Sequence, residues 1–264
     1  MSSPNFSELL SSLAQNGAHE WSVEITENWM QGRTTYGGLS AALCLKAVQN
    51  QYPDLPPLRS AQINFIGPAG GPVQIKTNIM RQGRSVAYLS AEMFTDKGLA
   101  THAVFCFGSQ RESRINEHFT HTPDVPGIAD SQNFFESGFG PAFAANFDSM
   151  LAKGGFPISG SDQHEHFIWV RHKDPQADDI AGLLGIADMP PPAVLPMFTE
   201  FAPISSMTWM VNFLTDDIST HDGWWLMRSA AEHARDGYSS QDMQVWNSDG
   251  ELVITGRQCV AVFY

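Results

Sequence analysis

Basic residues are scarce in this chain of 264 residues. Lysine and arginine together number 15, against 28 aspartates and glutamates, which gives a formal net charge of -13. Such an excess repels nucleic acid backbones and anionic lipid surfaces at long range, so we expect neither nucleic acid nor a membrane as a partner. A small phosphorylated ligand is still compatible with this charge, because a few arginines within a cleft can override the global field.

Cysteine is scarce and the histidines are scattered, so neither residue suggests a metal or disulfide framework. Cys44, Cys106 and Cys259 have no metal-ligand spacing and fall in apolar segments, and none of the nine histidines belongs to an HExxH pair. No run approaches the roughly 18 apolar residues of a membrane span, and the first residues lack the basic region of a secretory signal. We therefore expect a cytoplasmic protein with reduced thiols and with no metal or cofactor.

Several familiar catalytic signatures are also missing. The sequence has no GxSxG elbow, no phosphate-binding P-loop, no GxGxxG after a strand and no CxxC pair. Covalent serine chemistry is therefore not expected. What remains is a water-activating or binding site made from isolated polar residues in apolar surroundings.

The most informative segment that is present runs from 32 to 51. Between Leu39 and Val48 only Ser40 and Lys46 interrupt its apolar character. An amphipathic surface helix would instead show polar residues over about half of its circumference. We therefore predict a helix that other elements enclose.

Strand-like runs lie on both sides of this helix. An alternating run at 21–25 precedes it, and a short peripheral helix at 7–13, capped by Asn5 or Ser7, comes before that run. Four runs joined by turn signals follow the buried helix, at 58–66, 73–80, 85–95 and 99–107. One helix embraced by a curved antiparallel sheet is the hotdog arrangement.

The second half of the chain repeats this pattern in a weaker form. A shorter helix is expected at 176–187, where prolines end it, and strands are expected at 143–151, 166–172, 203–214, 224–233, 239–246 and 252–263. The segments that close the two halves match in pattern and spacing, which indicates an internal duplication. We predict an α+β double hotdog with a continuous sheet, made of an N-terminal unit at 1–109, a linker at 110–138 and a C-terminal unit at 139–264.

Two polar residues stand out because their surroundings are apolar. Asp188 follows the second predicted helix, where the helix dipole disfavours a carboxylate by roughly 0.3 to 1 kcal/mol. That position, together with apolar neighbours, should raise its pKa and make it a better general base. Gln258 lies on an otherwise apolar strand face and needs a partner for its amide. Each also has an ordinary interpretation, as a solvated carboxylate in a turn or as a structural hydrogen bond.

Hydroxyl groups form a third candidate, in the run from 205 to 208. Strand alternation would place Met207 and Trp209 on one face, with Ser206 and Thr208 on the other. Hydroxyls near the start of a strand are common, so a structural role for them is equally compatible with the sequence.

Glycines and arginines are the remaining candidates for substrate contacts. Gly37 and Gly38 could present amide N–H groups to an anion at the start of the buried helix, or could merely permit close packing. Arginines suited to phosphate binding, or alternatively to a solvated surface, are Arg33, Arg84, Arg235 and Arg257.

Short segments in both halves of the chain resemble those of a known family and follow one another in the same order. The N-terminal ones are TYGGLSAAL at 35–43, FIGP at 65–68, RQGRS at 81–85 and DKGLA at 96–100. The C-terminal ones are LLGIADMP at 183–190, DGWWL at 222–226 and DGELVITGRQ at 249–258. Together they resemble the two hotdog domains of the acyl-CoA thioesterase II family and its thioesterase-like relatives.

The resemblance implies hydrolysis of an acyl-CoA thioester by an Asp, a Gln and a Thr or Ser in the second domain, with water as the nucleophile. The Asp of the family corresponds to Asp188 and the Gln to Gln258. Its hydroxyl position falls on Ile204, so Ser206 or Thr208 is expected to substitute. An acyl-CoA substrate and a homo-oligomer follow as expectations. The alternative is a protein of the same fold that binds acyl-CoA or another hydrophobic ligand without turnover.

Overall fold

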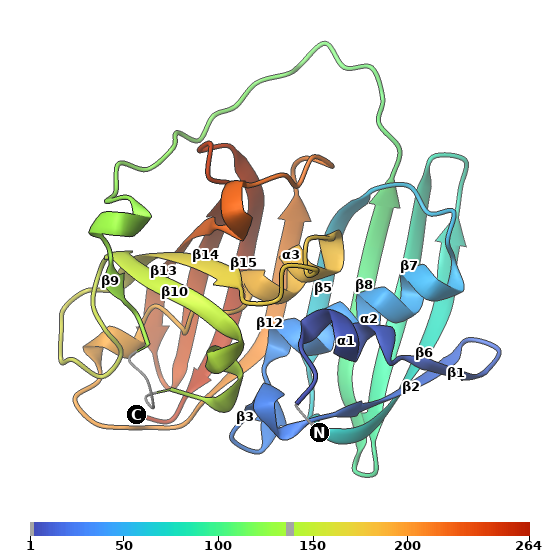
Figure 1. Cartoon of the computed structure of the whole chain (residues 1–264), viewed down its shortest axis with the longest axis horizontal. Coiled ribbons are helices and arrows are strands. Elements are labelled where there is room, and N and C mark those ends of the chain that lie inside the picture. Colours follow the sequence, from blue (N-terminus) through green and yellow to red (C-terminus); the bar gives the residue numbers. More distant parts are fainter. Residues whose placement is uncertain (1–2, 136–139) are drawn as a thin grey trace.

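Strands from both halves of the chain join in one antiparallel sheet (Figure 1). The computed structural model describes residues 3–135 and 140–264, and within these ranges the sheet has 13 strands in the order β1-β2-β6-β7-β8-β5-β12-β15-β14-β13-β11-β10-β9. The N-terminal strands are β1 (Ala14–Gly17), β2 (Glu20–Ile25), β5 (Leu58–Phe65), β6 (Gly71–Gln82), β7 (Val86–Thr95) and β8 (Gly98–Gly108). The C-terminal strands are β9 (Gln132–Asn133), β10 (Phe147–Lys153), β11 (Glu165–His172), β12 (Ile204–Phe213), β13 (Trp225–Arg235), β14 (Tyr238–Trp246) and β15 (Leu252–Val262).

The two halves meet where β5 pairs with β12, with Ile63 opposite Trp209. Strand order repeats on either side of this junction, because β5-β8-β7-β6-β2 on one side corresponds to β12-β15-β14-β13-β11 on the other. The main helices lie on one face of the sheet (Figure 1). The chain is therefore an α+β double hotdog with a continuous sheet, which confirms the predicted fold class.

The helix α2 (Gly37–Gln51) is the buried element that the sequence predicted. Leu39, Leu43 and Leu45 have no exposed surface, and the helix packs against β6, β7 and β8. Burying each such side chain contributes about 1.5 to 3 kcal/mol. The helix begins at the predicted glycine pair, and the first residues of the apolar segment form a separate hairpin, β3 (Met30–Gln31) with β4 (Thr34–Thr35), in whose turn Gly32 adopts a φ of 67°.

The second core helix, α3 (Ile180–Ala187), is shorter than the predicted 176–187. Asp179 is its N-cap, and the Asp179 side chain accepts a hydrogen bond of 2.9 Å from the Gly182 amide. The preceding turn is held instead by Asp174, whose carboxylate accepts hydrogen bonds from the amides of Ser7 and Gln176. These side-chain caps favour the turn over another helical turn.

The peripheral helix α1 (Phe6–Ser11) agrees with the prediction, and Asn5 rather than Ser7 caps it through a capping box with Glu8. No helix among the described residues is long and apolar enough to cross a membrane. The 3-10 turns are η1 (Glu27–Trp29), η2 (Ile128–Asp130), η3 (Ala142–Asn146), η4 (Leu195–Met197) and η5 (His221–Gly223).

Three short segments differ from the sequence-based prediction. The strand β1 was not predicted, because its residues, AQNG, are all exposed and show no apolar alternation. The predicted strand at 143–151 begins only at Phe147, because the residues before it form the turn η3. The strand β9 falls inside the predicted linker and pairs with β10.

The segment between the two halves arches over one end of the sheet (Figure 1). Residues 109–127, all of which the structure describes, form neither helix nor strand. The Gln110 side chain donates to Asp216 at 2.8 Å, and the Thr122 hydroxyl donates to the Gly250 carbonyl at 2.6 Å. The predicted boundary between linker and C-terminal unit, at 138 and 139, lies outside the described residues.

The N-terminus of α2 crosses α3 at very short distance. A Cβ atom at Gly38 would lie 2.1 Å from the Gly185 carbonyl oxygen and 2.6 Å from the Tyr36 ring. No real Cβ approaches backbone this closely, so glycine is required here for the two helices to pack.

Replacing Gly38 with alanine should therefore destabilise the protein, because the helix backbones must separate. We expect a loss of at least about 2 kcal/mol, seen in a thermal melt as a decrease of about 5 °C or more. Gly127→Ala is the matched control, since a Cβ at Gly127 would meet nothing within 4 Å. Equal melting temperatures for both variants would show that the helix crossing is not tightly packed.

Candidate active site

Asp188 lies where the two core helices meet. It forms the C-cap of α3, and it faces the first residues of α2. A Cβ at Gly37 would lie 2.6 Å from the Asp188 Oδ2 atom and 2.5 Å from the Phe65 ring. The absence of a side chain at Gly37 thus allows the carboxylate and the ring to reach the helix backbone, and both hotdog units contribute to the surroundings of Asp188.

Two glutamines continue from this carboxylate across the inner face of the sheet. The Gln258 Nε2 atom donates to Asp188 Oδ1 at 2.8 Å, and Gln241 Nε2 donates to Gln258 Oε1 at 3.0 Å. The Gln241 Oε1 atom in turn accepts from the Ala193 amide at 2.9 Å. Gln258 and Gln241 are 3% and 0% exposed, so their amides would cost about 1 to 3 kcal/mol each if unpaired.

The carboxylate of Asp188 is poised to exchange a proton near neutral pH. Burial raises its pKa from 3.8 to about 7, while the hydrogen bond from Gln258 and the Gly38 amide N–H both act to lower it. We expected two causes, the apolar neighbours and the C-terminal dipole of α3, and the desolvation by apolar neighbours is the larger one. The N-terminus of α2 faces the same carboxylate through the Gly38 amide, which acts in the opposite direction to the dipole of α3.

Tyr36 is a neighbour of Asp188 that the sequence analysis did not single out. It precedes α2, its ring stacks on Phe143 at 4.4 Å between centroids, and its hydroxyl donates to the Gly185 carbonyl at 3.4 Å. Burial raises the pKa of Tyr36 well above its usual value, and Asp188 raises it further. The available signal was the position of Tyr36 directly before the glycine pair.

The two predicted hydroxyls lie on opposite faces of β12, so the prediction that they share a face is wrong. A β-bulge between Ser206 and Thr208 shifts the register: Ser206 lies opposite Val260, whereas Thr208 lies opposite Cys259. Ser206 therefore shares the inner face with Gln258, and Thr208 is exposed on the outer face. Of the two, the structure brings only Ser206 toward the glutamine.

Ile204, at the position where the family resemblance placed a hydroxyl, also lies on the inner face of β12. It is opposite Val262 and packs against a small apolar cluster formed by the loop before β12 together with Ala231 of β13. On β15, Val260 opposite Ser206 is two residues beyond Gln258, whereas Val262 opposite Ile204 is four residues beyond it. A hydroxyl at position 204 would therefore lie further from Gln258 than the Ser206 hydroxyl does.

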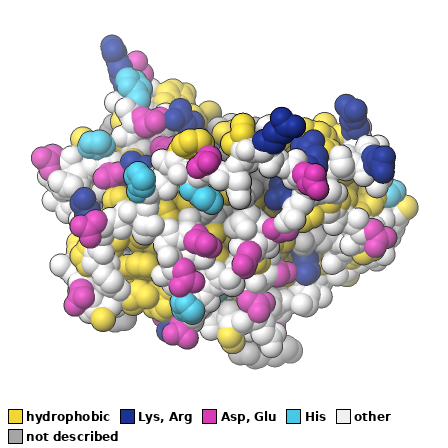
Figure 2. Space-filling model, turned by 90° about the horizontal axis from the view of Figure 1, so that it is seen from above, with side chains coloured by type: hydrophobic (Ala, Val, Ile, Leu, Met, Phe, Trp, Pro, Cys, Tyr) yellow, Lys and Arg dark blue, Asp and Glu magenta, His cyan; other side chains and the backbone are white. Residues whose placement is uncertain are grey.

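The structure does not bring Arg84 to Asp188. Arg84 lies in the β6–β7 turn beside Val86, which is opposite Gly108, whereas Phe65 near the carboxylate is opposite Thr101. Gly108 and Thr101 are seven residues apart on β8, so the turn that carries Arg84 lies about 23 Å along the strand from Phe65. In Figure 2, several Lys and Arg side chains gather on the side of the molecule that holds the N-terminal unit.

The other candidate arginines differ in their surroundings. Arg235 and Arg257 pair with acidic side chains, Asp236 at 3.4 Å and Glu232 at 2.8 Å. Arg33 is exposed in the β3–β4 turn, three residues before Tyr36. Arg257 directly precedes Gln258, but it is exposed on the opposite face of β15.

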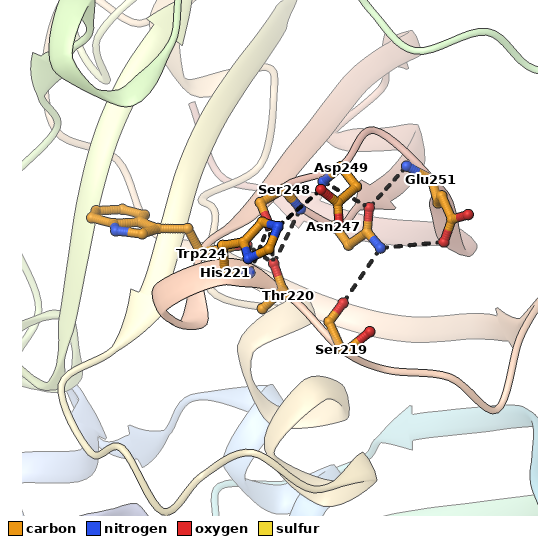
Figure 3. A network of polar contacts seen from close by, with 8 residues as sticks. All are labelled: Ser219, Thr220, His221, Trp224, Asn247, Ser248, Asp249 and Glu251. Atoms are coloured by element: carbon orange, nitrogen blue, oxygen red, sulfur yellow. Dashed lines mark hydrogen bonds and ion pairs between the residues drawn. The ribbon is translucent and has the colours of Figure 1, made fainter.

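A second polar cluster contains the residue types of a serine triad but not the geometry (Figure 3). The His221 ring nitrogen Nε2 contacts Asp249 at 3.0 Å, while the Ser248 hydroxyl accepts from the backbone amide of His221 at 2.7 Å. The histidine ring therefore does not contact the serine as a base would. The Thr220 hydroxyl donates to the Trp224 carbonyl and completes a clamp between two loops.

Comparisons with known proteins agree with this architecture. Residues 25–108 match the acyl-CoA thioesterase N-terminal domain, and residues 121–262 match the acyl-CoA thioesterase C-terminal domain. No curated protein matches the chain.

Solved structures match over almost the whole chain. A hotdog-fold protein of unknown function from Alicyclobacillus acidocaldarius is 25% identical, with a TM-score of 0.87 and 98% of each chain covered. The acyl-CoA thioesterase II TesB2 from Mycobacterium marinum is 17% identical, with a TM-score of 0.78 and coverage of 97% of this chain and 98% of its own.

A third structure, the tesB protein of Mycobacterium avium subspecies paratuberculosis, is 14% identical, with a TM-score of 0.79 and coverage of 98% and 99%. The structural likenesses below 25% identity support the fold, and the two domain matches carry the family assignment. With both of its hotdog units matched in order, this chain belongs to the acyl-CoA thioesterase family.

Proposed function

We propose that this protein hydrolyses the thioester of an acyl-CoA, with Asp188 as the general base. The observation that carries the proposal is a half-buried carboxylate, held by a 2.8 Å hydrogen bond from Gln258 at the junction of the two units, whose desolvated surroundings raise its pKa to about 7. A general base works best when its pKa lies near the operating pH, because it is then both available and strong enough.

In this mechanism, the oxygen of a water molecule attacks the thioester carbonyl carbon, and Asp188 accepts the proton. The carbon–sulfur bond then breaks, and the proton passes to the departing thiolate, which gives the free acid and CoA. One N–H of the Gln258 amide is used on Asp188, so the second can donate to the carbonyl oxygen or to the water. Ser206 would help to hold the water. Of the two glycines, Gly37 would contact the substrate through its backbone, because the Gly38 amide is already used on Asp188.

Release of free thiol from acyl-CoAs of different chain length tests this proposal. We expect release for at least one chain length, with Asp188→Asn as the blank. Binding of acyl-CoA without any thiol release would contradict the proposal and would favour a binding protein of the same fold.

Ser206 and Thr208 form a matched pair for assigning the hydroxyl. Because Ser206 shares a face with Gln258, Ser206→Ala should reduce kcat/KM about fivefold to tenfold, the value of one hydrogen bond to the attacking water. Thr208→Ala changes an exposed residue on the outer face and should leave kcat/KM within about twofold of the parent. The reverse order of effects would assign the hydroxyl to Thr208.

A further inference from the structure

The backbone of the loop before β12 fixes the direction of the hydrogen-bond chain that ends on Asp188. A peptide N–H can only donate, so the Ala193 amide requires an acceptor, and Gln241 must present its Oε1 atom. The Nε2 atom of Gln241 then faces Gln258, which must present its own oxygen. Only the Nε2 atom of Gln258 is left for Asp188.

This direction matters because the amide group of a glutamine can rotate by half a turn at little cost in free energy. A Gln258 amide rotated by half a turn would present its oxygen to the Asp188 carboxylate, and two acceptors would then face each other. The rotated form is prevented by Gln241, which has 0% exposed surface and therefore no water to compensate for a lost partner.

We propose that Gln241 is a positioning residue, which locks the Gln258 amide so that it donates to Asp188. The effect of Gln241 on catalysis rests on the function proposed above. Its effect on the ionisation of Asp188 does not. In the same way, Gln241 links the loop that carries Ala193 to the candidate base through a chain of three hydrogen bonds.

Loss of Gln241 should act on Asp188 in one direction. The hydrogen bond from Gln258 lowers the pKa of Asp188, so weakening this bond should raise that pKa. Tyr36, which also faces Asp188, stays neutral in this range because its own pKa is raised well above its usual value. The change in Asp188 ionisation is therefore separable from other groups at the site.

The test is a titration of the Asp188 carboxyl carbon by 13C NMR, with the resonance assigned from its loss in Asp188→Asn. Gln241→Met keeps the length of the side chain without its polar atoms, and Gln241→Asn is the second variant if the first does not fold. We expect the midpoint in either variant to rise toward that of Gln258→Leu. In a Gln258→Leu background, Gln241→Met should have no further effect, because the two act in series.

Activity provides a second readout. For Gln241→Met, kcat/KM should fall about threefold to tenfold at pH 6 and should recover at pH 9, where the base is ionised in both proteins. A merely structural defect would lower kcat/KM at both pH values. If the protein releases no thiol at all, the titration still decides the role of Gln241.

Ser239→Ala is the matched control, because Ser239 is a buried residue of the same strand, 1% exposed, and lies outside the hydrogen-bond chain. In Ser239→Ala, the midpoint of the Asp188 titration should equal that in the parent protein. The proposal is overturned if Gln241→Met leaves the midpoint unchanged while Gln258→Leu shifts it, or if the two shifts add.

Discussion

Replacing Asp188 with asparagine is expected to reduce thiol release from acyl-CoA by about 10²- to 10⁴-fold, the usual contribution of a general base. Asparagine is close to aspartate in size and can still accept the Gln258 hydrogen bond, but it cannot take a proton from water. The measurement is kcat/KM for the best acyl-CoA of the panel, at pH 8.

Asp249→Asn is the control for this experiment. Asp249 is an exposed aspartate that pairs with His221 in the loop clamp, so its replacement should leave the rate unchanged. A fully active Asp188→Asn protein would show that the site assignment is wrong, whatever the fold.

The same Asp188→Asn substitution should stabilise the folded protein above pH 7. The folded-state pKa of about 7 exceeds the ordinary value of 3.8, so the folded protein holds a proton that the unfolded chain has lost. Stability therefore falls as the pH rises from about 4 to about 7, by about 1.4 kcal/mol for each pH unit at most. Asparagine cannot ionise and avoids this loss.

We expect Asp188→Asn to gain about 2 to 4 kcal/mol at pH 8, seen as a rise of about 5 to 10 °C in the melting temperature, and to gain nothing at pH 4. Thermal melts of both proteins at several pH values measure the difference. A melting temperature that differs equally at pH 4 and pH 8 would mean that the ionisation of Asp188 is not the cause.

The principal elements of the fold could be predicted because their patterns are local. The apolar character of α2 on every side required an enclosing sheet, and alternating runs with turn signals marked the strands. Asp188 and Gln258 were candidates because each is polar in an apolar segment, and the structure joins them at 2.8 Å.

Features that depend on contacts between distant segments could not be predicted. The bulge in β12 reverses the face of Ser206 relative to Thr208, and strict alternation gives no sign of it. Gln241 gained its importance only when the Ala193 amide and Gln258 were seen on either side of it. Likewise, the dipole of α3 could be assessed only together with the N-terminus of α2, which faces the same carboxylate.

The most direct test of the central claim is the pH dependence of kcat/KM for thiol release. If Asp188 is the general base, kcat/KM should rise with pH through a single ionisation near the pKa of about 7 and level off above pH 8. Gln258→Leu should move this ionisation upward, because it removes a hydrogen bond that lowers the pKa. A profile that is flat between pH 5 and pH 8 would contradict the account.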